Sequence, residues 1–368
     1  MNYILFDPPD IERFYPFTLT RPLGEMRLAG MTIKEYWEQK LGCKVSYLTR
    51  SHLSDLYPAV WGEKNALICS SLNFQFLESL GLSINDFHRY FIHYDSKSSN
   101  WNSSLSEKNV LNVELDSLYD QMVKLGLGDN CFHSLCDLTD LALDFSRHKS
   151  NLDCSKNIFF NDDDGPIYIE KNVVIMEGAM IRGPVYICEG SVIKMGAKIY
   201  GPCVIGPHCR IGGEVSNSIF LGYSNKSHEG FLGHAIIGEW CNIGAGTSNS
   251  NLRNDYGAVK MWDYTQNKFK DSGRQFLGLY MGDHSKCAIN TSFNTGTTVG
   301  VNCNIFGSGF HRNYMPSFSW GGSQGIQKYD FDKAVVVARK VMARRNVKTT
   351  NKYIDMLRCV YDIVLTMR

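Results

Sequence analysis

The stretch "IEKNVVIMEGAMIRGPVYICEGSVIKMGAKIYGPCVIGPHCRI", residues 169–211, carries an isoleucine at every sixth position. A smaller residue follows each isoleucine four positions later. One residue type that returns at a fixed interval indicates a repeat architecture. The isoleucines are Ile169, Ile175, Ile181, Ile187, Ile193, Ile199, Ile205 and Ile211. The smaller residues are Val173, Ala179, Val185, Ser191, Ala197, Cys203, Cys209 and Val215.

A period of six fits neither an amphipathic helix nor the alternation of a single strand. It fits a triangular prism in which three short strands make one coil, with the isoleucine pointing inward and the small residue near a corner. Each buried isoleucine contributes roughly 1.5–3 kcal/mol of transfer free energy, and the stacked coils pair their backbones. The repeat therefore predicts a parallel β-helix of the hexapeptide type.

The same period continues beyond Ile211 after a shift of two residues, and it resumes after an interruption at residues 248–280. About eighteen hexads in all predict about six coils. The later inward positions are predicted to be Ile219, Asn225, Phe231, Ile237, Ile243, Met281, Cys287, Phe293, Val299 and Ile305.

The interruption has the alternating pattern of a β-hairpin arm around the polar "TQN". Its Trp262 and Tyr264 need a surface to cover them. That surface is either the arm's own coil or a neighbouring subunit. We predict the neighbouring subunit, because prisms of this kind usually trimerise.

The segment after the repeat, residues 326–368, carries apolar residues at three- and four-residue spacing. This spacing predicts two amphipathic helices. Arg344 and Arg345 are expected at the solvated end of the first helix, where basic side chains are favourable.

The segment before the repeat has strand-like runs at residues 3–6, 44–48 and 65–70 and a helical run at 32–42 that Gly42 closes. Strand, helix and strand in this order predict a parallel, Rossmann-like α/β sheet. The predicted domains are residues 1–155, residues 165–325 with the arm at 248–280, and residues 326–368.

The composition is typical of a soluble globular protein, with 43% hydrophobic residues, 20% charged residues and a net charge of +1. The balanced charge gives no indication of nucleic acid as the main partner. No basic leader and no long apolar run is present, so we expect a cytoplasmic protein without a membrane partner. The twelve cysteines lack a C-x-x-C pair, and we expect reduced, mostly buried thiols.

The stretch "HEGFLGHAIIGEWCNIGAGTSNSN", residues 228–251, lies within the repeat but departs from its consensus. It resembles the acetyltransferase half of the GlmU-type bifunctional family, which makes UDP-N-acetylglucosamine and has the pattern H-L-x-Y-x-G-D-x-x-I-G-x-x-x-N-I-G-A-G-T. The register is continuous from His228 through "NIGAGT". The resemblance covers residues 165–325 well and residues 1–70 weakly.

The resemblance implies a left-handed prism, a homotrimer, and acetyl transfer from acetyl-CoA to glucosamine 1-phosphate. His228 falls on the family's catalytic base. Phe231 and His234 replace a tyrosine and an aspartate of the family, which leaves the acceptor sugar open. The implied substrate-binding residues are Asn242, Asn251, Lys194, Phe231 and Lys226. The implied acetyl-CoA contacts are Ala245 and Gly307.

The chemistry supports a histidine in this role. Acetyl transfer to an amine requires a base that takes the amine proton as the C–N bond forms, and imidazole is suited to this task at neutral pH. An isolated histidine in a loop is otherwise a surface residue.

The first domain resembles a variant nucleotidyltransferase group through "ERFYPFTLTRPLGEMR", which implies Arg13, Arg21 and Arg27 as nucleotide-binding residues. Uridyltransfer from UTP would require Mg²⁺. The family's glycine-rich loop is absent, and "SLNF" stands where an aspartate is expected. Retained uridyltransfer and a degenerate domain with surface arginines both remain open.

Three functions follow from these observations. The leading hypothesis is acetyl transfer to a sugar phosphate, with uridyltransfer as a second activity. The others are a sugar-1-phosphate nucleotidyltransferase whose prism assembles the oligomer, and a non-catalytic trimeric scaffold. His208, His284 and His311 do not reproduce the spacing of a three-histidine metal site, and we predict no metal site.

Overall fold

The computed structural model describes residues 1–72, 92–95, 134–143 and 157–367. The chain divides into two compact units. The first unit comprises Met1–Phe14, Thr20–Met26 and Met31–Leu138. The second comprises Tyr15–Leu19, Arg27–Gly30 and Thr139–Arg368. Two short pieces of the N-terminal sequence therefore belong to the second unit.

The first unit contains a four-stranded sheet in the order β4-β1-β5-β6. Its first three strands are parallel, and β6 runs antiparallel to β5. The strands are β1 (Asn2–Phe6), β4 (Val45–Leu48), β5 (Lys64–Cys69) and β6 (Ile92–Asp95). The three strands predicted from the sequence are thus confirmed, as is their parallel arrangement.

Helix α1 (Ile33–Leu41) begins and ends as its sequence predicts. Thr32 and Glu35 form a reciprocal capping box at its start, and Gly42 ends it in the left-handed conformation at φ 67°. The shorter elements are η1 (Ile11–Phe14), η2 (Phe17–Leu19), η3 (Leu23–Glu25), β2 (Arg27–Leu28), β3 (Met31–Thr32), α2 (Ser51–Ser54) and α6 (Leu135–Ala142).

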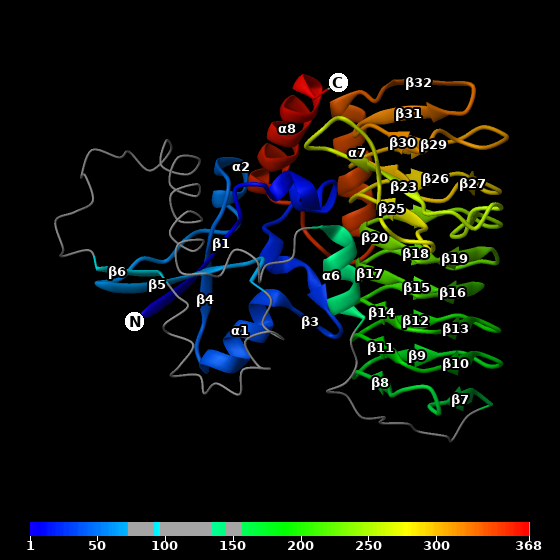
Figure 1. The fold of residues 1–368 in the computed structure, drawn as a ribbon, viewed down its shortest axis with the longest axis horizontal. Coiled ribbons are helices and arrows are strands. Elements are labelled where there is room, and N and C mark those ends of the chain that lie inside the picture. The colour runs from blue at the N-terminus through cyan, green and yellow to red at the C-terminus, as the bar shows by residue number, and fades with distance from the viewer. Residues whose placement is uncertain (73–91, 96–133, 144–156, 368) are drawn as a thin grey trace. The chain divides into compact units, whose positions relative to one another are not determined.

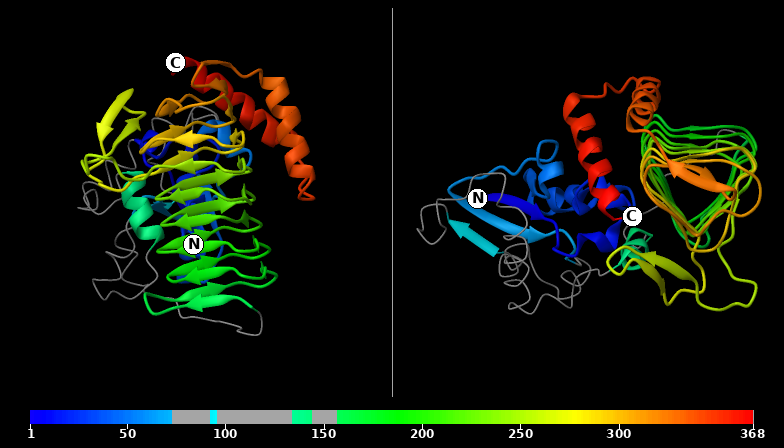
Figure 2. Two further views of the ribbon diagram at one scale, coloured as in Figure 1. Left: turned by 90° about the vertical axis from the view of Figure 1, so that its right-hand side faces the viewer. Right: turned by 90° about the horizontal axis from the view of Figure 1, so that it is seen from above.

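The second unit is built on a parallel β-helix with three faces, and its triangular section is visible from above in Figure 2. The first face consists of β8 (Ile167–Ile169), β11 (Val185–Ile187), β14 (Cys203–Ile205), β17 (Ile219–Gly222), β20 (Ile236–Glu239), β25 (Leu279–Met281), β28 (Thr297–Val299) and β30 (Tyr314–Met315). The second face consists of β9 (Val174–Ile175), β12 (Val192–Ile193), β15 (Arg210–Ile211), β18 (Asn225–Lys226), β21 (Asn242–Ile243), β26 (Lys286–Cys287), β29 (Asn304–Ile305), β31 (Ser319–Gly322) and the antiparallel β32 (Gly325–Lys328). The third face consists of β7 (Phe159–Asn161), β10 (Met180–Arg182), β13 (Lys198–Tyr200), β16 (Glu214–Ser216) and β19 (Phe231–Gly233), with β22 (Ser248–Asn249) and β27 (Ser292–Phe293) pairing beyond them.

The predicted β-helix is confirmed, but it is longer than the six coils expected from the sequence. The first face alone carries eight parallel strands, which stack along the prism in Figure 1. The count of hexads left out Val215, which is an inward residue, and it left out the last coil, whose inward residues include Gly321, which no aliphatic pattern reveals. The hand of the prism stays a prediction from the family resemblance.

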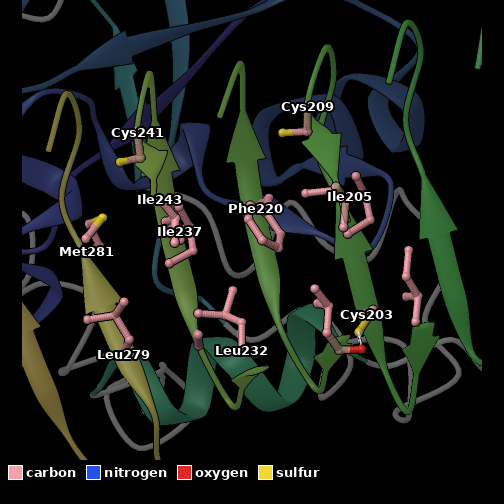
Figure 3. Packing of buried hydrophobic residues seen from close by; sticks show 14 of the residues in the cluster. Cys203, Ile205, Cys209, Phe220, Leu232, Ile237, Cys241, Ile243, Leu279 and Met281 are labelled. Carbon is pink, nitrogen blue, oxygen red and sulfur yellow. Dashed lines mark hydrogen bonds between the residues drawn. The ribbon is translucent and has the colours of Figure 1, made fainter. Parts of the chain in front are cut away.

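The interior is lined by the predicted isoleucine series and then departs from the predicted phase. Ile181 to Ile211 are almost completely buried, as expected. Val215, predicted near a corner, pairs with Ile199 and points inward. The inward residues of the next coil are consequently Phe220, Lys226 and Leu232, not Ile219, Asn225 and Phe231. Phe220 and Leu232 are seen pointing into the prism in Figure 3.

The corner between the first and second faces, here called the first corner, holds one left-handed residue per coil. Several of these residues are large and aromatic, and their rings stack from coil to coil. His208 lies 4.9 Å from Tyr223, Tyr223 lies 4.2 Å from Trp240, and Trp240 lies 6.2 Å from His284, measured between ring centroids. Stacking of this kind compensates for the strain of a positive φ at a residue with a side chain. We call these four residues the aromatic column.

Two C-terminal helices pack along this corner, and both are confirmed. Helix α7 (Phe331–Ala343) is capped by Asp330, and α8 (Asn351–Thr366) is capped by Thr350. The ring of Tyr361 in α8 meets Phe318 at 4.8 Å, and the hydroxyl of Tyr353 lies 2.7 Å from His284 Nε2. Both helices therefore belong to the same unit as the prism.

The outer side of the first face is also covered by the chain itself. Arg27 Nε donates to the carbonyl of Leu221 at 2.9 Å, and the ring of Phe17 meets Tyr280 at 6.4 Å. Ile219 and Ile236 on this outer side are therefore almost fully buried.

The arm forms the predicted hairpin from β23 (Lys260–Asp263) and β24 (Lys268–Asp271). It packs on its own chain, which is the alternative to the predicted neighbouring subunit. Trp262 stacks on Tyr314 of the first face at 4.0 Å with an interplanar angle of 7°, and Tyr264 meets the edge of Tyr15 at 5.5 Å. The two aromatic residues are half-buried within one chain, and a neighbouring subunit at the arm stays a prediction.

Most of the cysteines in the described ranges are buried and unbridged, as expected. Burial raises the pKa of Cys203 and of Cys209 to about 12, so these thiols are poor nucleophiles near neutral pH. No helix in the part of the chain that the structure describes has the length and apolar character needed to cross a bilayer.

Candidate functional site

His228 lies on the corner between the second and third faces, here called the second corner. It follows β18 and precedes β19, and its side chain is exposed. The backbone of Gly213 on the preceding coil lies close to that of His228. A Cβ on Gly213 would lie only 2.6 Å from the carbonyl oxygen of His228. The backbone that carries the imidazole is thus packed tightly onto the coil before it.

Lys226 secures this corner from inside the prism. Its side chain occupies the inward position beside Ile211 and is 1% exposed. Its Nζ donates to the carbonyl oxygens of His228 at 2.7 Å and Gly212 at 3.1 Å. Burial lowers the pKa of Lys226 to about 8. The expectation that Lys226 contacts substrate directly is therefore wrong, because its amino group faces the backbone of two coils.

Several other predicted site residues share the second corner with His228. Lys194 lies there two coils earlier, Ala245 one coil later and Gly307 three coils later, in the turns that follow β12, β21 and β29. Lys194 and Ala245 are half-buried, and Gly307 is exposed. The structure thus aligns these residues along one edge, and their individual roles stay predictions.

Asn242 lies beside that edge on the outer surface of the second face. It is exposed, and it pairs in register with Asn225 on the coil before it. Asn225 Nδ2 donates to Asn242 Oδ1 at 3.4 Å. The second face therefore presents amide groups next to the corner that carries His228.

Asn251 is placed elsewhere, at the corner between the third and first faces. Its Nδ2 lies 2.9 Å from Nδ1 of His234, whose ring stacks on Phe276 of the arm at 5.2 Å. Phe231 reaches toward the same point, since a Cβ on Gly233 would lie 2.5 Å from Phe231 Cζ and 2.9 Å from Asn251 Nδ2. The third face thus separates two groups, with His228 at one edge and Asn251 with His234 at the other.

Burial lowers the pKa of His234. The neutral imidazole is the form that accepts the amide N–H of Asn251 at Nδ1. Where the resembled family has an aspartate, this chain therefore has an uncharged hydrogen-bond acceptor. The sequence flagged the substitution but not the stacking partner Phe276, because Phe276 comes from the inserted arm.

Arg345 was expected at a solvated helix end, and the structure corrects this. The residue is half-buried, and its Nη2 donates to Asn225 Oδ1 at 2.6 Å. Arg344 next to it is exposed, as expected. Arg345 is thus a residue near the candidate site that sequence patterns did not identify.

The three histidines considered for a metal do not come together. His208 and His284 are separated within the aromatic column by two other rings, and His311 lies beside Phe293 inside the third face. Across residues 1–72, 92–95, 134–143 and 157–367, no group of three or more possible ligands is placed to hold a metal.

His311 is 2% exposed, neither ring nitrogen has a hydrogen-bond partner among the described residues, and burial lowers its pKa. A histidine with a lowered folded-state pKa binds fewer protons than the unfolded chain, so it lowers stability as the pH falls through about 6.5. We expect His311→Phe to raise the free energy of unfolding by about 1–3 kcal/mol and to weaken its decrease between about pH 7 and pH 5. Urea unfolding at a series of pH values measures both effects. If His311→Phe is less stable than the parent at every pH, the buried His311 does not destabilise the fold.

The arginines predicted to bind nucleotide have different surroundings. Arg13 is exposed and pairs with Asp10 at 3.0 Å, whereas Arg21 is 5% exposed. Arg27 belongs to the second unit, where it donates to the carbonyl oxygens of Leu221 and Gly30. Its guanidinium is therefore engaged with the chain's own backbone. A role of the three arginines in nucleotide binding stays a prediction.

The carboxyl end of β1 carries Asp7, which is 1% exposed. Asp7 accepts hydrogen bonds from the backbone N–H of Leu23 at 2.8 Å and from Thr49 Oγ1 at 2.5 Å. Burial raises the pKa of Asp7, and Arg50 opposes this effect. Mg²⁺ prefers accessible, ionised carboxylates. The described residues at this sheet edge therefore do not fit a Mg²⁺ site.

Comparisons with known proteins give one family match and several distant structural matches. A family described as sugar nucleotidyl transferase matches residues 3–78. A search of curated proteins finds no match.

Among solved structures, a Bacillus cereus protein named as an acetyltransferase is 13% identical, with 58% of this chain and 99% of that chain covered and a TM-score of 0.33. A hexapeptide transferase family protein from Anaplasma phagocytophilum is 13% identical, with 55% and 98% covered and a TM-score of 0.30. A variant of perosamine N-acetyltransferase from Caulobacter crescentus, solved with CoA and GDP-perosamine, is 10% identical, with 90% and 98% covered and a TM-score of 0.18. At this level of identity and overlap, these likenesses say nothing about the substrate of this chain.

Proposed function

We propose that the protein transfers an acetyl group from acetyl-CoA to the amine of a sugar phosphate, with His228 as the general base. The observation that carries the proposal is the placement of His228, which is exposed on a corner that Lys226 and Gly213 hold in place. A base on a rigid support is what an acyl transfer needs, because small displacements of a catalytic group cost rate.

His228 can carry the one proton that the reaction moves. The neutral amine attacks the thioester carbonyl, and the imidazole of His228 takes the amine proton as the C–N bond forms. The C–S bond then breaks, and the proton on the imidazolium passes to the leaving thiolate to give free CoA. No metal or redox group takes part in these steps.

The accessible edges of the prism are consistent with this location. The first face is covered by the chain's own N-terminal pieces and arm, and the first corner by α7 and α8. The second corner, which carries His228 and lies next to Asn242, has exposed residues on consecutive coils. Asn242 offers an uncharged amide to sugar hydroxyls, and we propose that it contacts the acceptor sugar.

The direct test is thiol release from acetyl-CoA, followed with a thiol reagent, in the presence of glucosamine 1-phosphate. We expect release that depends on both substrates and a product whose mass is that of the N-acetylated sugar phosphate. A panel of other amino-sugar phosphates and nucleotide-linked amino sugars identifies the preferred acceptor. Absence of acceptor-dependent release across the panel would rule out the proposal.

Nucleotidyl transfer is the second candidate function, and the observation that favours it is the sugar nucleotidyl transferase match over residues 3–78. The described part of the first unit has a parallel sheet, and such sheets bind their ligands at the carboxyl ends of the strands. Release of pyrophosphate from UTP and N-acetylglucosamine 1-phosphate, measured with and without Mg²⁺, tests this function independently. Absence of both reactions would favour the third hypothesis, a scaffold.

A further inference from the structure

A group of positive side chains surrounds Asn225 on the outer surface of the second face. Arg210 is the neighbour of Asn225 in register on the preceding coil, so their Cα atoms lie about 4.8 Å apart. Arg345 reaches Asn225 from the end of α7 with a hydrogen bond of 2.6 Å. The amide of Asn225 therefore accepts a hydrogen bond from one arginine and has a second arginine as its neighbour in register.

The two arginines affect each other electrostatically. Burial lowers the pKa of Arg345, and the charges of Arg210 and Arg344 lower it further. Like charges held this close destabilise one another unless an anion lies between them. The fold nevertheless holds Arg345 in place through Asn225.

Among residues 157–367, neither Arg210 nor Arg345 takes part in an ion pair, although other surface arginines of the same unit do. The charge of Glu239 raises the pKa of Tyr223 at the first corner, and the charges of Arg345 and Arg27 lower it.

We propose that Arg345, Arg210 and Asn225 form a binding site for a phosphate group of one of the two substrates. The guanidinium fork binds two phosphate oxygens at once, and the amide of Asn225 orients it. This inference rests on the proposed acetyl transfer for the identity of the ligand but not for the existence of the site.

The position relative to His228 supports a substrate phosphate over an unrelated anion. Asn225 opens the strand that leads to His228, three residues later, so their Cα atoms are at most about 10 Å apart. Both reactants of the proposed transfer carry phosphate, namely acetyl-CoA in its nucleotide part and the acceptor at its sugar phosphate. A phosphate held at Arg345 would leave the rest of either molecule within reach of the imidazole.

The site is tested first without turnover, using inorganic pyrophosphate as the probe in calorimetric titrations at low ionic strength. We expect the parent protein to bind pyrophosphate, and Arg345→Gln to weaken binding by about 10-fold or more, because a charge-assisted bidentate contact is lost. Arg210→Gln provides a second variant at an exposed position, where folding is not at risk. Arg339→Gln, an exposed arginine on α7, is the matched control for loss of one charge and should leave binding nearly unchanged.

The source of the phosphate is identified from Michaelis constants. If the site holds the donor, Arg345→Gln raises the KM for acetyl-CoA and leaves that for the sugar phosphate unchanged. If it holds the acceptor, Arg345→Gln raises the KM for the sugar phosphate and leaves that for acetyl-CoA unchanged. Acetyl transfer to an unphosphorylated amino sugar should then be equally fast in the parent and in the variant. If the parent binds pyrophosphate through Arg345 but releases no thiol, the phosphate site is supported and the proposed acetyl transfer is wrong. Equal pyrophosphate binding in the parent, Arg345→Gln and Arg210→Gln would overturn the site itself.

Discussion

Replacement of His228 by alanine is expected to lower kcat for acetyl transfer by about 10²–10⁴-fold, with a much smaller change in KM. The imidazole removes a proton only as the C–N bond forms, so its loss destabilises the transition state more than the bound substrates. Because the side chain is exposed, the free energy of unfolding should stay within about 0.5 kcal/mol of the parent value. Steady-state kinetics of thiol release and urea unfolding provide the two measurements.

Glu229→Gln is the control for this variant. Glu229 is also exposed and lies next to His228 on the same corner, so a general disturbance of the corner would affect both variants. We expect Glu229→Gln to retain most of the activity. A His228→Ala variant with parental kcat would show that another group accepts the proton.

The second large effect is expected at Lys226, where activity and stability should change in opposite directions. Lys226→Met removes a buried amine from a position flanked by isoleucines and replaces it with an apolar chain of similar length. The carbonyl of His228 then loses its donor, and we expect kcat to fall by about 10-fold to 100-fold as the corner becomes less fixed. The variant should nevertheless fold and be at least as stable as the parent at neutral pH, because a buried amine is costly.

The pH dependence separates this explanation from simple misfolding. The folded-state pKa of Lys226, about 8, lies below its ordinary value, so the unfolded chain binds more protons between about pH 8 and pH 10.5. Parent stability should therefore rise with pH in that window, with Lys226 contributing about 3 kcal/mol. Lys286, whose pKa burial also lowers to about 8, keeps its own contribution in the variant.

Lys226→Met should accordingly show a smaller rise in stability across the same window. Ile243→Met, at the inward position of the next coil of the same face, is the matched control and should keep both the full rise and the activity. A Lys226→Met protein with parental kcat would show that the lysine does not position His228.

The prism was predictable because one physical requirement repeats along the chain. Each coil buries an aliphatic residue at the same geometric position, and this generates the period of six from Ile169 to Ile211. The phase was then lost because Gly212 and Gly213, the latter at φ 67°, make a corner tight enough for Val215 to turn inward early.

The sequence did not reveal the change of phase, because both sides of the first face are buried. Ile219 on its outer surface is as apolar as Phe220 on its inner surface, so composition does not say which one points inward. On the second face, by contrast, the wrong phase predicted an outward position for Lys226, which in fact points into the prism. A pattern of apolar residues has no means of predicting a buried amine whose partners are backbone carbonyls.

The candidate site was predictable in part for a related reason. His228, Asn242 and Ala245 lie close in the sequence and share neighbouring coils, so a local motif brings them together. Arg345 is 120 positions from Asn225, and its approach depends on how α7 packs along the first corner. No local pattern contains that information, and the same is true of Phe276 against His234.

The aromatic column has a consequence for how the prism comes apart. A solenoid behaves as a chain of modules, each stabilised by its neighbours, and such arrays can lose their end modules one at a time. Rings that interlock from His208 to His284 make the loss of one coil expose the faces of two others. The coil that carries Lys226, His228 and Asn225, the partner of Arg345, lies within this interlocked stretch, so fraying at either tip should leave that coil intact.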